Sequence, residues 1–312
     1  MAADWADMRS HLDRRGLAAA VVILIAGVGV AAQQPAQQDY QIKLHRHSVA
    51  GRTYRFVASA AQSQTTVMTV DAQTGPSEDV AIAADLTGQL TTLAVTAHGK
   101  DAKVSLVIEQ SKCAADGVTS PLLPPGTTVV AVRDGETTMY SVNDAPVNPR
   151  AARCLRIALP LNTDGKATDD DIFGTRARQK VGSAWPMNST LAAEDLLAGS
   201  GLMVAPRDVS GSTRLTELTS FNDRPALRID GEMALKNVSV PLPAGVTVRL
   251  GQFRAALSAV LPVDPARTDG QMSMKMAGRI ECDGAVKGHV MRLIMTMTQR
   301  IEHTLTLQEA EK

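Results

Sequence analysis

The sequence predicts a mainly β protein in which antiparallel hairpins form two similar sheets or one large curved sheet, with little helix and an N-terminal signal segment. Two observations support the β class. Val, Thr, Leu and Ile alternate with polar residues along most of the chain, and these runs stop at Gly, Asp, Asn or Pro. Alternation of period two places one set of side chains on each face of a strand. A third observation, an apolar run near the start, predicts the signal segment.

The N-terminal segment reads as an export signal. The apolar run Leu17–Ala32 follows Arg14 and Arg15 and ends in small residues. It is shorter than the about 20 residues that a membrane-spanning helix needs, and it suits the apolar core of a signal peptide. We therefore expect a cleaved signal peptide over residues 1–32 and a polar linker over 33–39. The alternative is an uncleaved N-terminal anchor.

Three hairpins follow from their turn residues. We expect turns near His98–Asp101, at Asp134-Gly135 and at Asn222-Asp223. Asp-Gly suits a type I′ turn, because both central residues of that turn need positive φ.

The first and last of these hairpins resemble each other, and the longest polar stretch, LPLNTDGKATDDDIFG, lies between them. This similarity favours a weak internal duplication. It predicts an N-terminal β domain over residues 40–160 and a C-terminal β domain over 161–312. The competing interpretation is that β-hairpins simply resemble one another.

Helix is expected at two places at most. The stretch Ser189–Gly201 contains helix formers and ends in glycine, and Arg249–Pro262 places apolar residues at helical spacing before a proline. Either stretch is also compatible with a strand.

Composition limits the partners. The chain has 32 basic and 32 acidic residues and only 3% aromatic residues. Phosphate backbones require a basic surface, and single-stranded nucleic acids stack on aromatic rings. We therefore expect no nucleic-acid partner, and membrane contact only through an uncleaved N-terminal anchor.

The three cysteines lie far apart and form no C-x-x-C pair, which excludes zinc ribbons and thioredoxin-type motifs. In an oxidising compartment one pair can bridge, and Cys113 and Cys154 are the closest in sequence. The alternative is three unpaired core residues, Cys282 among them.

Catalytic signatures are absent from the sequence: it has no G-x-S-x-G, S-x-x-K, H-E-x-x-H, Walker loop or G-x-G-x-x-G after a strand. We expect no catalytic residue, cofactor or metal. Two weaker patterns suggest metal sites. Asn162–Asp171 partly fits an EF-hand-like calcium loop, but reads better as an Asx-Gly turn with an acidic loop. His45 and His47 would share one face of a strand, as half a metal site or an exposed edge.

Methionine is the most unusual feature. Two segments, MSMKM and MRLIMTM, alternate strictly and flank the turn-like CDGAVKG. We expect Met272–Cys282 and Gly288–Arg300 to pair antiparallel and to turn at Asp283–Lys287. The candidate ligand-binding residues are Met272, Met274, Met276, Met291, Met295 and Met297. Packed core is the favoured interpretation, and a deformable apolar pocket or a Cu(I) site are the alternatives.

Short phrases along the chain resemble a family of exported bacterial β-rich proteins of unknown function. They are RTYRF, RDGETTMYSVNDAPV, DDDIFG…KVGSAW and GRIECDGAVKG. The resemblance implies an antiparallel β fold and an address in the cell envelope. It implies no catalytic residues.

Together these observations predict an exported periplasmic or cell-envelope protein, or one held at the inner membrane by a single N-terminal span. Its expected role is non-enzymatic binding or a structural part, with a small apolar ligand or an envelope protein as partner. The alternative is a hydrolase whose catalytic residues are dispersed in sequence.

Overall fold

The computed structural model describes residues 38–308 except 116, 136, 162–166, 243 and 287–288, and gives no side-chain placement for 199, 200 and 286. The predicted signal segment lies outside the described residues. The described residues belong to one compact unit, Gln37–Lys312. They form a single antiparallel sheet of 14 strands that is not closed, so one large sheet is confirmed over two separate sheets.

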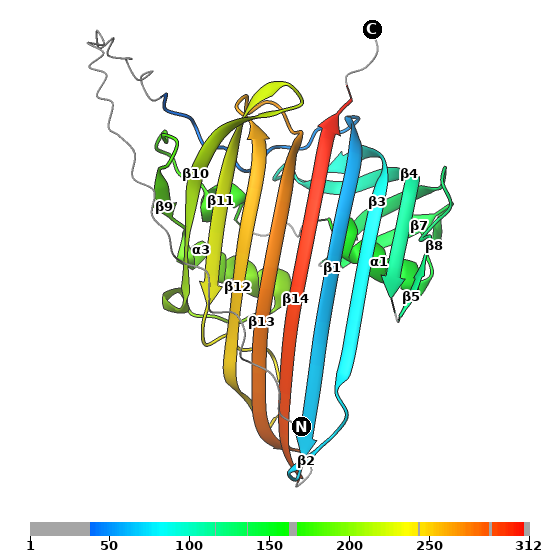
Figure 1. Cartoon of the computed structure of the whole chain (residues 1–312), viewed down its shortest axis with the longest axis vertical. Coiled ribbons are helices and arrows are strands. Elements are labelled where there is room, and N and C mark those ends of the chain that lie inside the picture. Colours follow the sequence, from blue (N-terminus) through cyan, green and yellow to red (C-terminus); the bar gives the residue numbers. More distant parts are fainter. Residues whose placement is uncertain are drawn as a thin grey trace, which may run out of the picture. The chain divides into compact units, whose positions relative to one another are not determined.

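From edge to edge the strand order is β8-β7-β6-β4-β3-β1-β14-β13-β12-β11-β10-β9 (Figure 1), and β2 and β5 pair off this path with β1 and β4. The strands are β1 Thr53–Val70, β2 Gln73–Thr74, β3 Glu78–Val95, β4 Asp101–Ala115, β5 Val118–Ser120, β6 Thr128–Asp134, β7 Thr137–Val142, β8 Ala145–Pro146, β9 Ala184–Pro186, β10 Val209–Phe221, β11 Arg224–Leu235, β12 Val246–Pro262, β13 Gly270–Val286 and β14 His289–Leu307. The first long strand pairs with the last, and this pairing joins the two halves of the chain. A domain boundary near residue 160 stays a prediction.

The predicted hairpins are present. Strands β3 and β4 turn between Val95 and Asp101, and β10 and β11 turn at Asn222 and Asp223, whose φ angles are 49° and 59°. The third turn lies one residue later than predicted. Asp134 still pairs with Thr137, so the left-handed conformation begins at Gly135, with φ 58°.

The described residues contain three α-helices: α1 Pro149–Ala158, α2 Asp169–Phe173 and α3 Ser189–Ser200; a short 3₁₀ turn, η1, covers Pro206–Asp208. The predicted helix α3 is confirmed. The Asn188 side chain caps its first turn, and Gly201 ends it in the left-handed conformation. Helix α1 was not predicted, although Asn148 caps it and Pro149 starts it, which is a usual N-terminal pattern.

The helical interpretation of Arg249–Pro262 is wrong, because this stretch lies in strand β12. Its backbone pairs with β11 on one side and β13 on the other. Gly251 and Phe253 are buried on alternate positions, as expected for a strand. Tertiary pairing therefore overrides a helical spacing of apolar residues.

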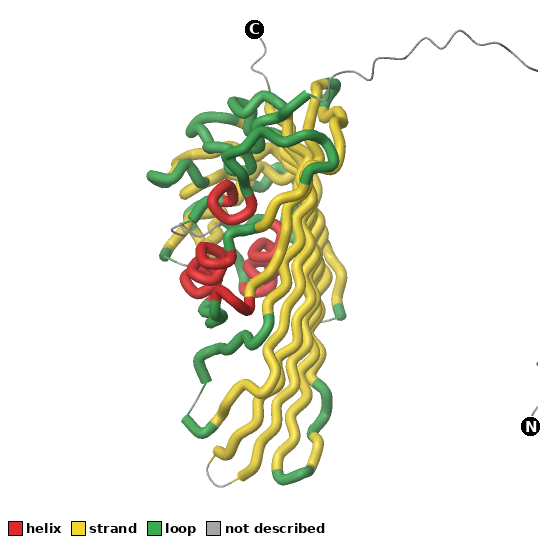
Figure 2. The backbone as a smooth tube through the Cα atoms, turned by 90° about the vertical axis from the view of Figure 1, so that its left-hand side faces the viewer, coloured by secondary structure: helices red, strands yellow, loops and turns green. Residues whose placement is uncertain are grey.

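All three helices lie on one face of the sheet (Figure 2). Helix α1 packs mainly on β1, β3, β4 and β7, whereas α3 packs on β10. A first core lies under α1 and includes Leu86, Leu106 and Leu155. A second core lies under α2 and α3 and includes Ile172, Ala193 and Phe253. A third, smaller core joins Tyr40 and Ile42 to Trp185 and to residues of β10 and β11.

A disulfide joins Cys113 on β4 to Cys154 in the middle of α1. The pairing that sequence proximity favoured is therefore present. Cys282 on β13 carries a free thiol, and its side chain is buried in the second core.

Candidate functional site

The six candidate methionines lie on one face of the sheet. Strands β13 and β14 pair so that Met274 faces Ile301 and Met295 faces Ile280. Residues directly opposite each other in an antiparallel pair point to the same face. The even positions of β13 and the odd positions of β14 therefore share a face, and this is the face that carries the helices. Met276, Met291, Met295 and Met297 pack against the second core there. We call the surface formed by the six methionines the methionine face.

The side chains of the methionine face are neither fully buried nor fully exposed. Met272 is 44% exposed, and the other five side chains are partly buried. None of the six belongs to the fully buried core residues. Met274 packs into none of the three cores described above.

The position of the helices explains this intermediate burial. Of the described apolar residues of β14, Ile301 and Leu305 pack against the α1 core, and α3 rests on β10. Strands β13 and β14 therefore run between the two helical layers, and no helix of the described residues makes extensive contact with either strand. Apolar neighbours extend the face along the strands. They are Leu293, partly buried on β14, and Met68, 47% exposed on β1.

The strands of the methionine hairpin are longer than predicted, and the turn at Asp283–Lys287 is wrong. Asp283 still faces Arg292, and pairing continues to Val286 opposite His289. Asp283 is held in the strand by ion pairs with Arg249 at 3.3 Å and Arg292 at 3.7 Å. The residues that link the strands, 287 and 288, lie outside the described part of the chain.

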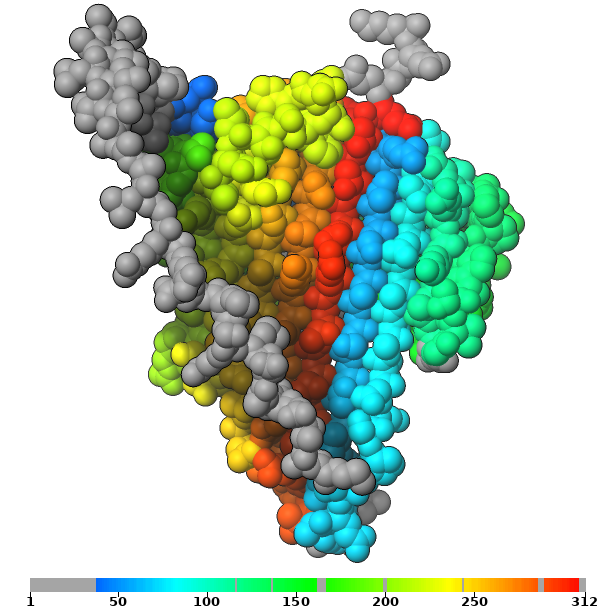
Figure 3. Space-filling view, viewed as in Figure 1, coloured from blue at the N-terminus to red at the C-terminus, as the bar shows by residue number. Residues whose placement is uncertain are grey.

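The opposite face of the same strands, which Figure 3 shows from the front, carries no helix of the described residues, and charged side chains gather on it. Its centre is Glu281, which accepts hydrogen bonds from Arg279 at 2.9 Å, from Arg292 at 3.1 Å and from Arg249. These hydrogen bonds, Arg279 first, lower the pKa of Glu281 to about 2. Sequence reasoning missed this cluster, because its four members come from three strands.

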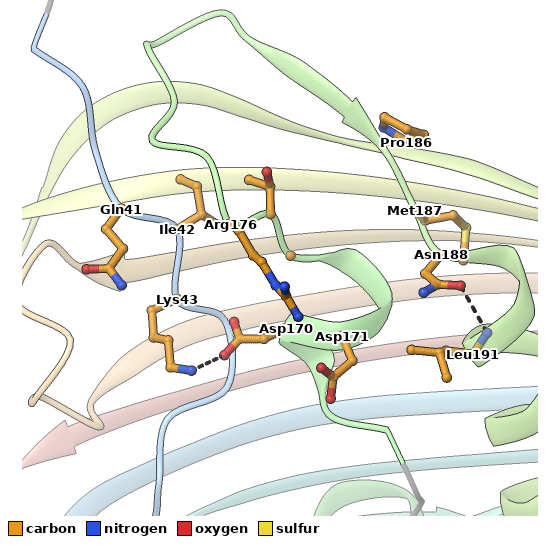
Figure 4. A pocket seen from close by; sticks show the side chains of 12 residues that line it. Gln41, Ile42, Lys43, Asp170, Asp171, Arg176, Pro186, Met187, Asn188 and Leu191 are labelled. Carbon is orange, nitrogen blue, oxygen red and sulfur yellow. Dashed lines mark hydrogen bonds and ion pairs between the residues drawn. The ribbon is translucent and has the colours of Figure 1, made fainter.

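A polar pocket of about 550 Å³ lies beside α2 and the N-terminal end of α3 (Figure 4). Lys43 forms an ion pair with Asp170 at 2.5 Å. The other carboxylate oxygen of Asp170 accepts hydrogen bonds from the backbone N–H groups of Leu44 and His45, at 2.6 and 3.2 Å. Asp170 thus fastens the segment before β1 to α2. No described lining residue is a histidine, so the pocket offers no imidazole as a general base for the hydrolase alternative.

The structure places the residues of the two weak metal patterns as follows: each pattern has described residues that are engaged in other contacts. His45 and His47 do not lie in a strand, although their ring centroids are 4.8 Å apart. His45 is buried, and its Nε2 hydrogen-bonds the His98 carbonyl at 2.8 Å. In the acidic loop, residues 162–166 are outside the described residues. The Asp171 carboxylate is engaged in a capping box with Thr168, which lowers the pKa of Asp171. No cluster of three His, Cys, Asp or Glu suited to a metal occurs in the described residues.

No protein-family model matches the chain, and no curated protein sequence matches it. Among solved structures, it is similar to a lipovitellin structure that concerns lipid–protein interactions, with a TM-score of 0.40 and 10% identity over 85% of this chain and 26% of that chain. It also matches a loop-deletion mutant of OmpT, an outer membrane protein of Vibrio cholerae, with a TM-score of 0.15 and 6% identity over 80% of this chain and 99% of that chain. It matches OccK11 (OpdR) of Pseudomonas aeruginosa as well, with a TM-score of 0.17 and 8% identity over 84% of this chain and 99% of that chain.

The chain spans about a quarter of the lipovitellin chain. At these scores the similarities carry no argument about function. In the described residues, no helix has the length and apolar character needed to span a bilayer.

Proposed function

We propose that this protein is an exported cell-envelope component that binds an apolar ligand or the apolar surface of a partner on the methionine face, without catalysing a reaction. The observation that carries the proposal is the position of six methionines, all on one sheet face, between two helical layers and only partly buried.

The physical basis is the flexibility of methionine. An unbranched thioether side chain has three rotatable bonds and adapts to irregular shapes. Surfaces rich in such side chains repack around different partners. Covering partly exposed thioethers with an apolar ligand removes their surface from water, at about 25 cal/mol per Å². A row of methionines along two long strands therefore suits an elongated apolar ligand better than a compact one.

Two features support export. The apolar run Leu17–Ala32 has the length and the small terminal residues of a signal peptide. The disulfide between Cys113 and Cys154 is of the kind that persists in oxidising compartments such as the periplasm. An inner-membrane location through an uncleaved anchor is the alternative within this proposal.

The test is binding of an uncharged fluorescent probe, N-phenyl-1-naphthylamine, to the mature chain. We compare the parent with a double variant, Met295→Gln with Met297→Gln, which keeps the length of both side chains and removes their apolar character. The matched control is Thr296→Gln with Thr298→Gln, on the same strand but on the opposite face. The methionine variant should weaken binding by about tenfold, since 1.4 kcal/mol corresponds to a factor of ten. The control should bind as the parent does.

Equal binding by the parent and both double variants would show that the probe binds elsewhere. Absence of binding by the parent would remove the proposal for small apolar ligands.

A further inference from the structure

His303 lies on the same face of the sheet as the six methionines, and one of its ring nitrogens is buried without a partner within the described part of the chain. It lies on β14, directly opposite Met272 on β13 and Ala58 on β1. Its ring centroid is 5.7 Å from that of Phe56. Its Nε2 atom is buried and has no hydrogen-bond partner in the described structure. The backbone of Ala158, the last residue of α1, lies next to the imidazole and favours its protonated form.

Among the described residues, no charged side chain is found to shift the pKa of His303. The neighbours on the same face of the three strands are Phe56, Ala58, Ala60, Gly270, Met272, Met274, Ile301 and Leu305. At the end of α1, the next residue is Leu159, whose carbonyl accepts a hydrogen bond from the Tyr140 hydroxyl on β7. Burial raises the pKa of Tyr140 to about 12, so this phenol is neutral at ordinary pH.

Burial also lowers the pKa of His303 to about 4, although the adjoining Ala158 backbone opposes this shift. The negative end of the α1 dipole would favour a cation as well. Desolvation outweighs both effects, because a protonated Nε2 would have a buried N–H and a charge without an acceptor.

Helix α1 is fastened unevenly to the sheet. The disulfide at Cys154 holds its middle to β4. Its C-terminal end, at Ala158 and Leu159, rests beside His303 without a covalent link. Any loosening by a charge at His303 therefore affects this end of the helix first.

We propose that His303 makes the docking of the C-terminal end of α1 sensitive to acid, so that acidification loosens this end of the helix and disturbs the adjoining end of the methionine face, at Met272 and Met274. The inference rests on the proposed function in taking the methionine face as the ligand site. It adds regulation by protonation.

The direction of the effect follows from linkage. The unfolded chain takes up a proton at His303 near pH 6.5, whereas the native chain does so only near pH 4. The stabilisation linked to His303 is therefore complete above about pH 6.5 and is lost as pH falls toward 4. At pH 5 the folding equilibrium constant should be about 30-fold lower than at high pH on account of this group alone.

The first measurement is urea unfolding of the mature chain from pH 7.5 to pH 4.5, with hydrogen exchange of the α1 amides at the two limits. The variants are His303→Leu and His303→Gln, so that failure of one to fold leaves the other. The matched control is His289→Gln, an exposed histidine on the same strand that pairs with Asp71 at 2.6 Å. Both His303 variants should lose the about 30-fold component at pH 5 and keep the protection of α1. Unchanged pH dependence in the variants, or equal α1 exchange of the parent at both limits, would overturn the inference.

The second measurement separates this inference from the proposed function. Release of N-phenyl-1-naphthylamine should become faster on acidification in the parent and stay constant in His303→Leu. If the parent binds the dye but releases it at one rate throughout, the regulatory role of His303 is wrong. If the parent binds no dye at any pH, the proposed function fails together with its regulation. Hydrogen exchange of the α1 amides would then decide by itself whether the docking of α1 is sensitive to acid.

Discussion

The core under α1 and the methionine face lie side by side on one sheet face, yet they are built in different ways. Under α1, β1 and β3 present small side chains such as Ala58, Ala60 and Ala84, and all three are buried. Small side chains let a helix approach closely, and Leu155 of α1 and Leu106 of β4 are fully buried there. On β13 and β14 the same alternation presents long methionines, and none of the described helices packs closely on them.

Alternation alone therefore does not define a core. Both regions alternate in sequence, but burial alternates clearly only along β1, whereas most of β14 has intermediate burial. A closed layer needs side chains of complementary volume on both sides. Flexible thioethers without a covering helix leave a surface that can adapt.

The largest expected effect is on the core under α1. The double variant Cys113→Ser with Cys154→Ser removes a cross-link between residues 41 positions apart. Loop-closure entropy predicts a loss of about 4 kcal/mol in the free energy of unfolding. Urea denaturation of the oxidised parent and the variant measures it. Cys282→Ser, which removes a free thiol, is the control and should cost clearly less. A loss of the same size in both would mean that the cross-link adds nothing of its own.

The second prediction compares one substitution in each region. Leu106→Ala should cost about 2–5 kcal/mol, because it leaves a cavity in a closed core. Met295→Ala should cost clearly less than Leu106→Ala, because its side chain is already partly in water and the site can relax. Urea denaturation of both variants tests the comparison. Equal losses would show that the methionine face is an ordinary packed core, and would weaken the proposed function.

The third and smallest expected effect is on the face of the sheet that carries no described helix. Hydrogen bonds from arginines lower the pKa of Glu281 on this face to about 2. Glu281 therefore contributes stability that is present above its unfolded pKa of about 4.5 and is lost as pH falls toward 2. Glu281→Gln should remove this part of the acid dependence in thermal melts between pH 5 and pH 2.

The control for that measurement is Glu302→Gln, which breaks an exposed pair with Arg300 on the same face. Exposed pairs contribute little. If the two variants show identical acid profiles, the cluster around Glu281 has no special role in holding β13 and β14 together.

Sequence patterns predicted the features that depend on neighbouring residues. The hairpin at Asn222-Asp223 follows from residues that tolerate positive φ, and α3 follows from helix formers ended by Gly201. Strict alternation in β13 and β14 predicted that the methionines of each strand share a face. The helical spacing of apolar residues in β12 gave a wrong prediction of a helix, because such a spacing carries no information about the strands that pair on both sides.

The sequence by itself determined the β class, most of the turns and the grouping of methionines within each strand, because these depend on backbone preferences within a few residues. Only the tertiary structure decided that β1 pairs with β14, that both methionine sets fall on one face, and that α1 covers the neighbouring strands but not these. It also decided the surroundings of Glu281 and His303. Such features depend on register and on contacts between residues far apart in sequence. A shift of one residue in register would have moved every methionine of one strand to the opposite face.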